Sequence, residues 1–180
     1  VMDSQGTLFV ADKGNATIRR VTPAGTVTTV AGIAGTNGSA DGTTLATFNQ
    51  PWGLAVDMAD NIIVADYNNH SLRRVLTSTA VETIAGGAWV GLSSTQALQF
   101  PPYGGDADGA GSSALFYHPA AVGVDRLGRL HVLDRDSHTL RLGIAVATPG
   151  APVITQHPQS LNVAPQAAAS FHVIASGVGT

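Results

Sequence analysis

The chain repeats one unit of sequence three times in the same phase, and this repetition limits its fold more than any other feature. The middle copy holds four apolar runs of five residues, which are Trp52–Val56, Asn61–Ala65, Ser71–Val75 and Val81–Ala85. Turns rich in Asp, Asn, Ser and Thr separate the runs. Because five residues are too few for an ordinary helix and the turns are too short for crossovers, the unit predicts a four-stranded antiparallel meander.

The copies occupy about residues 1–32, 48–87 and 116–146. The first copy has the expected strands Thr7–Ala11, Thr17–Val21 and Val27–Ala31. The positions that coincide without gaps are Asp3, Asp57 and Asp125; Asp12, Asp66 and Asp134; and Arg19, Arg73 and Arg141. A strand-only unit in tandem copies is typical of a propeller or solenoid. We therefore predict an all-β chain that forms a partial β-propeller of about three four-stranded antiparallel blades.

One turn in the unit tests the alignment at a single position. The first copy has Gly6 there, which can adopt a positive φ, and the other copies have Asp60 and Gly128. Aspartate is among the few residues other than glycine that tolerate this conformation. We expect a positive φ at all three positions, with the aspartate that begins each turn accepting backbone hydrogen bonds.

The sequence of the middle copy resembles the NHL repeat, named after an Asn-His-Leu signature. The signature stands here as Asn69-His70-Ser71-Leu72, and the Gly-rich connectors 31–42 and 103–111 are similar to the joints of that family. The resemblance covers about residues 1–146, although Ala16 replaces the signature histidine in the first copy and Ser137 replaces the asparagine in the third. It implies a six-bladed propeller that serves mostly as a binding platform.

Composition narrows the classes of partner. The 180 residues carry a net charge of −3 with acids and bases interspersed, so we expect no nucleic-acid partner and no polybasic membrane face. No apolar run is long enough to span a membrane. The absence of cysteine fits a reducing compartment or a bacterial secreted protein. Since Val1-Met2-Asp3 aligns with the end of a strand, we expect an export signal upstream and an extracellular or cell-surface location.

The third copy and the residues after it predict a change of domain. No fourth strand resembling those of the other copies follows Leu142, so we expect the last blade to lack its outer strand. We assign residues 1–147 to propeller blades and 148–152 to a linker. Residues 153–180 resemble the opening of a bacterial immunoglobulin-like module, which would be truncated here.

The loop between the second and third copies is the predicted ligand-binding region. It carries Trp89, Phe100 and Tyr103, and long loops with aromatic residues are where propellers usually vary their function. These residues predict contact with a protein or carbohydrate ligand. Trp52 begins an inner strand, so we interpret it as a core residue, with ligand contact as the alternative.

The remaining polar residues favour a structural role. The six recurring aspartates follow strands and precede turns, where carboxylates accept backbone hydrogen bonds. The recurring arginines are expected to pair with turn carboxylates, and His70 and His138, which also coincide, to bond neighbouring turns. Asp106 to Gly111 lacks the later ligands of a calcium loop. We expect no metal, no cofactor and no catalytic residue. The alternative is an NHL-type lyase or hydrolase, metal-dependent, with most catalytic residues in other blades.

Overall fold

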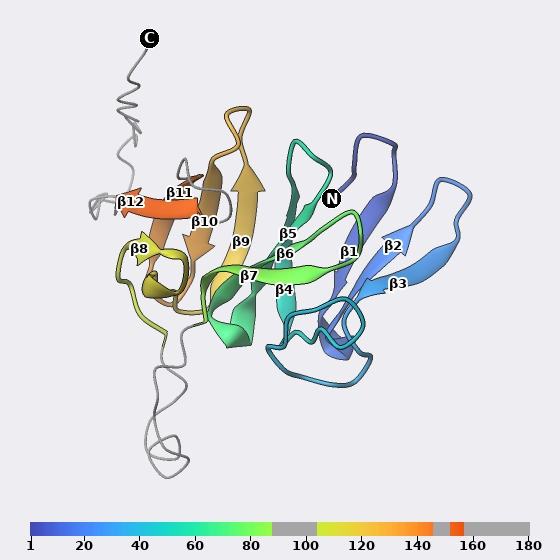
Figure 1. Cartoon of the computed structure of the whole chain (residues 1–180), viewed down its shortest axis with the longest axis horizontal. Coiled ribbons are helices and arrows are strands. Elements are labelled where there is room, and N and C mark those ends of the chain that lie inside the picture. Colours follow the sequence, from blue (N-terminus) through green and yellow to red (C-terminus); the bar gives the residue numbers. More distant parts are fainter. Residues whose placement is uncertain (88–103, 146–151, 157–180) are drawn as a thin grey trace, which may run out of the picture.

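The computed structural model describes residues 1–87, 104–145 and 152–156, and strands make up most of its regular structure (Figure 1). The first sheet contains β1 (Leu8–Asp12), β2 (Thr17–Val21) and β3 (Val27–Ala31). The second contains β4 (Pro51–Val56), β5 (Ile62–Asp66), β6 (Ser71–Val75) and β7 (Val81–Gly86). The third contains β8 (Gly109–Ala110), β9 (Pro119–Val124), β10 (Leu130–Asp134), β11 (Thr139–Ala145) and β12 (Pro152–Gln156).

Every strand pair among the described residues is antiparallel, and the three sheets follow one another in chain order across the molecule (Figure 1). The same part of the chain contains three short 3-10 turns, η1 (Lys13–Asn15), η2 (Tyr67–Asn69) and η3 (Gly111–Ser113). The strands recur at the spacing of the sequence copies, and η1 and η2 occupy equivalent places after β1 and β5. The prediction of an all-β propeller fold is confirmed.

Burial follows the position of each sheet. The middle sheet has neighbours on both sides, and all five residues of β5 are buried. In the first sheet, β3 alternates between exposed and half-buried residues before the buried Ala31. This is the pattern of a strand with one covered face, whereas an unbroken apolar strand such as β5 requires two covered faces.

Two apolar clusters join the sheets. One lies between the first and second sheets and includes Phe9, Ile18, Val64 and Phe48. The other lies between the second and third sheets and contains Phe116, which occupies the position of Phe48 in the next copy. Burying a phenylalanine side chain stabilises a fold by roughly 1.5–3 kcal/mol. Phe48 and Phe116, the first residues of their copies, therefore help to pack each sheet against the previous one.

Two glycines are required by close backbone approach. A Cβ on Gly53 in β4 would lie 2.6 Å from the Cα of Ala121 in β9, so the two inner strands can approach only without a side chain there. Gly86 has φ +74°, and a Cβ there would lie 2.4 Å from the carbonyl oxygen of His70. Both contacts are shorter than real Cβ atoms show, so neither position accommodates alanine without movement.

The predicted turn conformation is confirmed at all three equivalent positions, where φ is +79° at Gly6, +61° at Asp60 and +74° at Gly128. The prediction that the third blade lacks a fourth strand is wrong. Strand β12 pairs with β11, for example Ile144 with Val153. Because β11 otherwise presents unpaired backbone groups, the next extended segment of the chain pairs with it.

Strand β12 takes its first residue from the predicted linker and the others from the start of the predicted immunoglobulin-like module. The rest of that module, residues 157–180, lies outside the described residues. None of the described residues forms a helix with the length and apolar character needed to cross a bilayer.

Candidate functional site

The first set of recurring aspartates closes the turn between the first two strands of each blade. In the middle copy Asp57 Oδ1 accepts hydrogen bonds from the backbone N–H of Ala59 at 2.8 Å and of Asn61 at 2.9 Å. Asp3 and Asp125 accept the equivalent pairs of bonds in their own turns. The same geometry in three copies shows that these carboxylates are used by the backbone.

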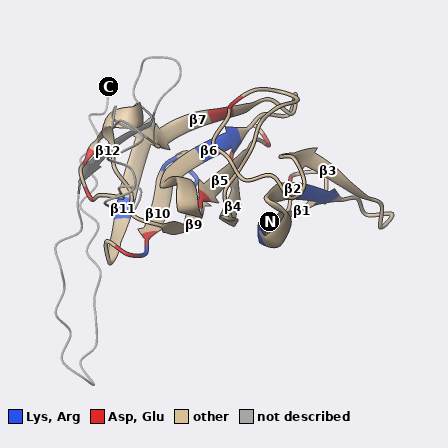
Figure 2. Ribbon diagram, turned by 90° about the horizontal axis from the view of Figure 1, so that it is seen from below, with Lys and Arg blue, Asp and Glu red and all other residues tan. Residues whose placement is uncertain are grey.

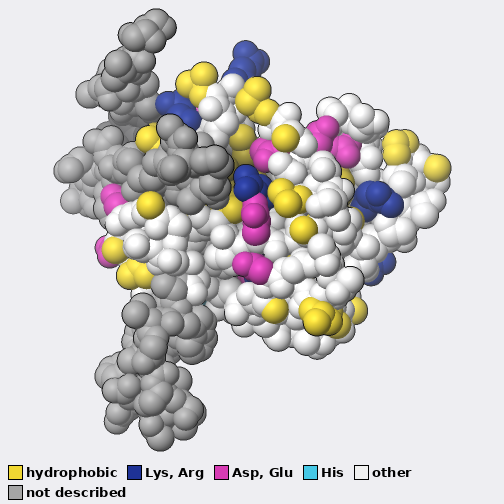
Figure 3. Space-filling view, in the orientation of Figure 1, with side chains coloured by type: hydrophobic (Ala, Val, Ile, Leu, Met, Phe, Trp, Pro, Cys, Tyr) yellow, Lys and Arg dark blue, Asp and Glu magenta, His cyan; other side chains and the backbone are white. Residues whose placement is uncertain are grey.

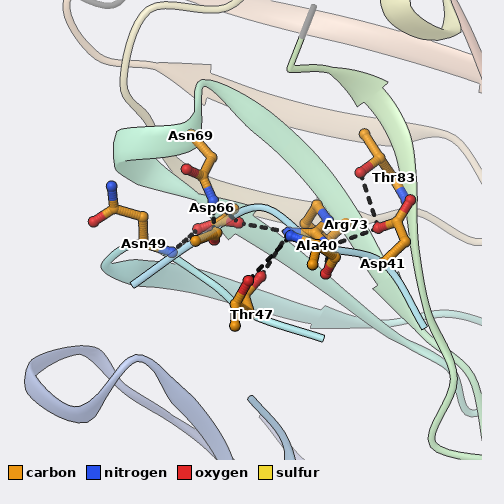
Figure 4. Close-up of polar contacts among 9 residues, drawn as sticks. Ala40, Asp41, Thr47, Asn49, Asp66, Asn69, Arg73 and Thr83 are labelled. Carbon is orange, nitrogen blue, oxygen red and sulfur yellow. Dashed lines mark hydrogen bonds and ion pairs between the residues drawn. The ribbon is translucent and has the colours of Figure 1, made fainter. Parts of the chain in front are cut away.

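The second set forms a buried clasp with the recurring arginines (Figure 4). Arg73 is completely buried, and it donates through one nitrogen to Asp66 at 2.9 Å and to the carbonyl oxygen of Thr47 at 3.0 Å. Its other terminal nitrogen donates to the carbonyl oxygen of Ala40 at 2.8 Å and to Asp41 at 2.6 Å. Arg73 on β6 thus holds the connector that leads into its own blade.

The clasp recurs in the third blade. Arg141 is completely buried, donates to the carbonyl oxygen of Ala107 and to Asp108 at 2.7 Å each, and bonds the carbonyl of Leu115. The terminal nitrogen that bonds Leu115 also lies 3.5 Å from Asp134. Arginines lie on the equivalent strands β2, β6 and β11 (Figure 2). The Asp-Gly joints at Asp41 and Asp108 are therefore anchors for these arginines.

Burial shifts the acidity of the clasp carboxyls. It raises the pKa of Asp66 from 3.8 to about 6, against the opposing effect of hydrogen bonds from Asn49 and Asn69 and of the charge on Arg73. Burial also raises the pKa of Asp134. Perturbed carboxyls often mark active sites. Here both groups are completely buried and face scaffold arginines, so the shifts follow from packing.

The signature histidine position requires a left-handed backbone. Ala16, His70 and His138 have φ of 56°, 52° and 55°. Histidine 70 is buried, and its Nδ1 accepts a hydrogen bond of 3.1 Å from the backbone N–H of His118 in the next blade. His70 therefore links two blades, while His138 is exposed.

One position of the repeat carries a different residue in each copy, and the three residues lie close together in the structure. The residue directly after Asp12, Asp66 and Asp134 differs in every copy: it is Lys13, Tyr67 and Arg135. These three meet around Trp52. The Lys13 Nζ lies 3.8 Å from the Trp52 ring centroid, the Tyr67 ring lies 4.6 Å from it, and an Arg135 nitrogen bonds the Tyr67 hydroxyl.

We call this region the Trp52 surface, and its members are Lys13, Trp52, Tyr67, His118, Arg135 and Asp136. The interpretation of Trp52 as a core residue is wrong, because the side chain is 42% exposed. Trp52 keeps the alternation of β4, since it lies on the same side as Leu54 and lines a cavity with Leu8 and Val10 of β1, which leaves much of the ring uncovered.

His118 completes the surface from the third blade. Its ring stacks on Tyr67 with centroids 4.4 Å apart and an interplanar angle of 18°. Its Nδ1 lies 2.6 Å from a carboxylate oxygen of Asp136. This hydrogen bond lowers the pKa of Asp136, and the charge of Arg135 adds to the effect. Three blades therefore contribute cations, aromatic rings and a carboxylate to one surface.

Sequence reasoning missed this surface, although the copies carried its signal. The residue that follows an aspartate present in all copies is itself different in each, unlike the aspartate before it. The predicted ligand contacts Trp89, Phe100 and Tyr103 lie outside the described residues. Among the residues that the structure describes, no three His, Cys, Asp or Glu side chains group to hold a metal ion. On the face shown in Figure 3, described basic and acidic side chains are interspersed.

Comparisons with known proteins agree with the fold. The NHL repeat family model matches residues 48–74. An auxiliary nutrient binding protein from Bacteroides thetaiotaomicron is similar over 78% of this chain and 35% of that chain, with 20% identity and a TM-score of 0.62. One from Bacteroides ovatus is similar over 79% of this chain and 36% of that chain, with 21% identity and a TM-score of 0.62.

A streptogramin B lyase structure is similar over 86% of this chain and 38% of that chain, with 11% identity and a TM-score of 0.54. The chain thus spans 35–38% of the length of these solved structures. No curated protein matches it in sequence. At these identities the likeness to solved structures concerns the fold, which is that of a propeller.

Proposed function

We propose that the chain is part of a non-catalytic binding platform that contacts its ligand through the Trp52 surface. The observation that carries the proposal is that some positions of the repeat are the same in every copy and bond within the scaffold, while another position differs between copies and lies beside the exposed Trp52. The recurring aspartates of the first set accept turn hydrogen bonds, and Arg73 and Arg141 pair with Asp66 and Asp108 in the clasps. The residues that follow Asp12, Asp66 and Asp134 differ, and they converge from three blades on one exposed indole.

The chemistry of this surface suits recognition. A tryptophan that is 42% exposed offers apolar area that a ligand can cover, and tryptophan is enriched among residues that dominate binding energy. Its neighbours restrain it before any ligand arrives, since Lys13 lies over the ring and Tyr67 lies against it. A preorganised aromatic loses little conformational entropy on binding.

The class of ligand we propose is a carbohydrate or a protein. The description of two similar structures as auxiliary nutrient binding proteins supports a binding role. The aromatic residues Trp89, Phe100 and Tyr103 of the loop between the second and third copies are proposed as additional contacts. An extracellular or cell-surface location is part of the same proposal, because polymeric nutrients and surface partners are met there.

The test compares Trp52→Ala with Met58→Ala, which removes another exposed large side chain from a turn outside the Trp52 surface. The probes are soluble polysaccharides (amylose, xylan, polygalacturonate and alginate) cast separately into native gels. We expect at least one to retard the unaltered chain and Met58→Ala equally, and to retard Trp52→Ala much less. Retardation that Trp52→Ala leaves intact would refute the proposed surface, and no retardation by any polymer would remove carbohydrate as the ligand.

The second candidate is a lyase or hydrolase, and one observation favours it. The Asp136 carboxylate holds His118 at Nδ1, an arrangement that orients an imidazole for general acid or base catalysis. Incubating each bound polysaccharide with the chain and measuring new reducing ends tests this candidate. Product formation that His118→Gln abolishes, while gel retardation persists, would replace the platform with an enzyme. Retardation without product would support the platform.

A further inference from the structure

We infer that the ligand of the Trp52 surface is an acidic saccharide, a uronic acid unit whose carboxylate is bound between Lys13 and Arg135. The inference rests on the proposed function and names its substrate class. Lys13 Nζ lies 3.8 Å from the centroid of the Trp52 ring, and the Arg135 guanidinium carbon lies 6.0 Å from it. Both cations also lie within 6 Å of the Tyr67 ring, at 5.7 and 5.9 Å.

The charge of Lys13 is not neutralised by a neighbour in the described part of the chain. No salt bridge there includes Lys13, and its contacts are with the two aromatic rings. Arg135 is only loosely paired, with its Nε 3.6 Å from Asp136, and its side chain is 55% exposed. Two available cations beside one indole favour a ligand that carries a negative charge close to an apolar face.

Asp136 narrows the class of anion. One of its oxygens bonds His118, and the other faces Arg135. A carboxylate next to the cations disfavours a second negative charge on the same ligand unit, and it accepts hydrogen bonds from hydroxyl groups. A uronic acid unit combines one carboxylate, several hydroxyls and an apolar C–H face within a single ring. This combination matches the cations, the acceptor and the indole together.

The shared geometry also explains why three blades are needed. Lys13 comes from the turn after β1, Trp52 and Tyr67 from the second blade, and Arg135 from the turn after β10. A single blade offers at most one of the two cations. The first and third blades thus supply the two cations that bind the carboxylate, while Trp52 of the middle blade supplies the apolar contact.

The experiment measures binding of a galacturonic acid hexamer and of its fully methyl-esterified form by isothermal titration calorimetry at low ionic strength. The variants are Lys13→Gln with Arg135→Gln, and the matched control is Arg20→Gln with Arg126→Gln, which removes two exposed charges elsewhere. We expect the unaltered chain and the control to bind the acid about tenfold more tightly than the ester. The Lys13 and Arg135 variant should lose that preference, and Arg135→Lys should retain most of it. Far-UV circular dichroism confirms that each variant is folded.

The outcomes separate this inference from the proposed function. If acid and ester bind equally, and Trp52→Ala weakens both about tenfold, the platform stands and the acidic class is wrong. If Trp52→Ala binds the acid as tightly as the unaltered chain, both are wrong. A single-stranded RNA oligonucleotide that binds more tightly than the acid, or a preference for the acid that the Lys13 and Arg135 variant retains, would also overturn the inference.

Discussion

Replacing Arg73 with leucine should strongly destabilise the fold, because Arg73 is the completely buried centre of the clasp in the middle blade. The change removes four hydrogen bonds, to Asp66, Asp41 and the carbonyl oxygens of Thr47 and Ala40. It also leaves the completely buried Asp66 without its cation. Breaking a buried ion pair by removing one partner costs roughly 3–5 kcal/mol. We expect a loss of about 4 kcal/mol in the free energy of unfolding, a large share of the stability of an ordinary domain.

The loss should depend on pH in a defined direction. Arg73 is one of the groups that oppose the burial-induced rise in the pKa of Asp66, so its removal raises that pKa further. A carboxyl with a raised folded-state pKa contributes stability that is present below its unfolded pKa and is lost as pH rises through the folded value. The deficit of Arg73→Leu should therefore be larger at about pH 7.5 than at about pH 5.

Arg19→Leu is the matched control, because Arg19 holds the same position in the first copy. Arg19 is half-buried, and none of the salt bridges among the described residues includes it. We expect its substitution to cost less than about 1 kcal/mol. Thermal unfolding followed by circular dichroism measures both, with Arg73→Leu melting about 10 °C lower than the unaltered chain. Equal melting temperatures for the two variants would refute the role of Arg73 as the clasp.

Three further substitutions test the scaffold. Gly86→Ala places a Cβ 2.4 Å from a backbone oxygen and should lower the free energy of unfolding by about 2 kcal/mol or more. Its control is Gly25→Ala, which has φ +82° but open space around it and should cost about 1 kcal/mol. Urea titration distinguishes the two variants, and equal costs would contradict the close approach. Asp66→Asn removes a carboxyl whose pKa is raised to about 6, so the unaltered chain should lose stability relative to this variant as pH rises from about 4 to about 6. Melting temperatures measured across that range test this, and parallel curves for the two proteins would argue against the raised pKa. Asp57→Ala removes two backbone hydrogen bonds and one from the Asn61 side chain, and it should cost about 1 kcal/mol in the same urea assay. An unchanged midpoint would show that the turn closes without them.

The strands of the blades could be predicted from sequence because local signals and the repeat agreed. Ser71–Val75, Thr17–Val21 and Val27–Ala31 have the predicted bounds. The strands predicted at Trp52–Val56 and Val81–Ala85 are each one residue longer, and those predicted at Thr7–Ala11 and Asn61–Ala65 are shifted by one residue at both ends. Strand β12 could not be predicted. The Pro and Gly residues before it are typical of a linker, and only the open edge of β11 supplies the reason for a strand.

The Trp52 surface shows a different limit. Alternation along β4 predicts which neighbouring sheet a side chain faces, but it does not predict how much of that side chain the neighbour covers, and Trp52 is 42% exposed. The convergence of Lys13 and Arg135 on that indole likewise depends on how blades stand beside one another. Sequence phase could place both residues in equivalent turns, and only the packed sheets bring those turns together.

The clasp defines how this architecture can be cut and reassembled. Arg73 lies on the third strand of its blade, yet it bonds Asp41, which lies more than thirty residues earlier in the sequence. A blade exchanged between propellers at its first strand would arrive with an arginine whose anchor belongs to a foreign joint. Chimeras spliced before Ala40 keep Arg73 together with its partners Ala40 and Asp41. The unit that can be transplanted therefore begins in the connector before β4 and not at the first residue of that strand.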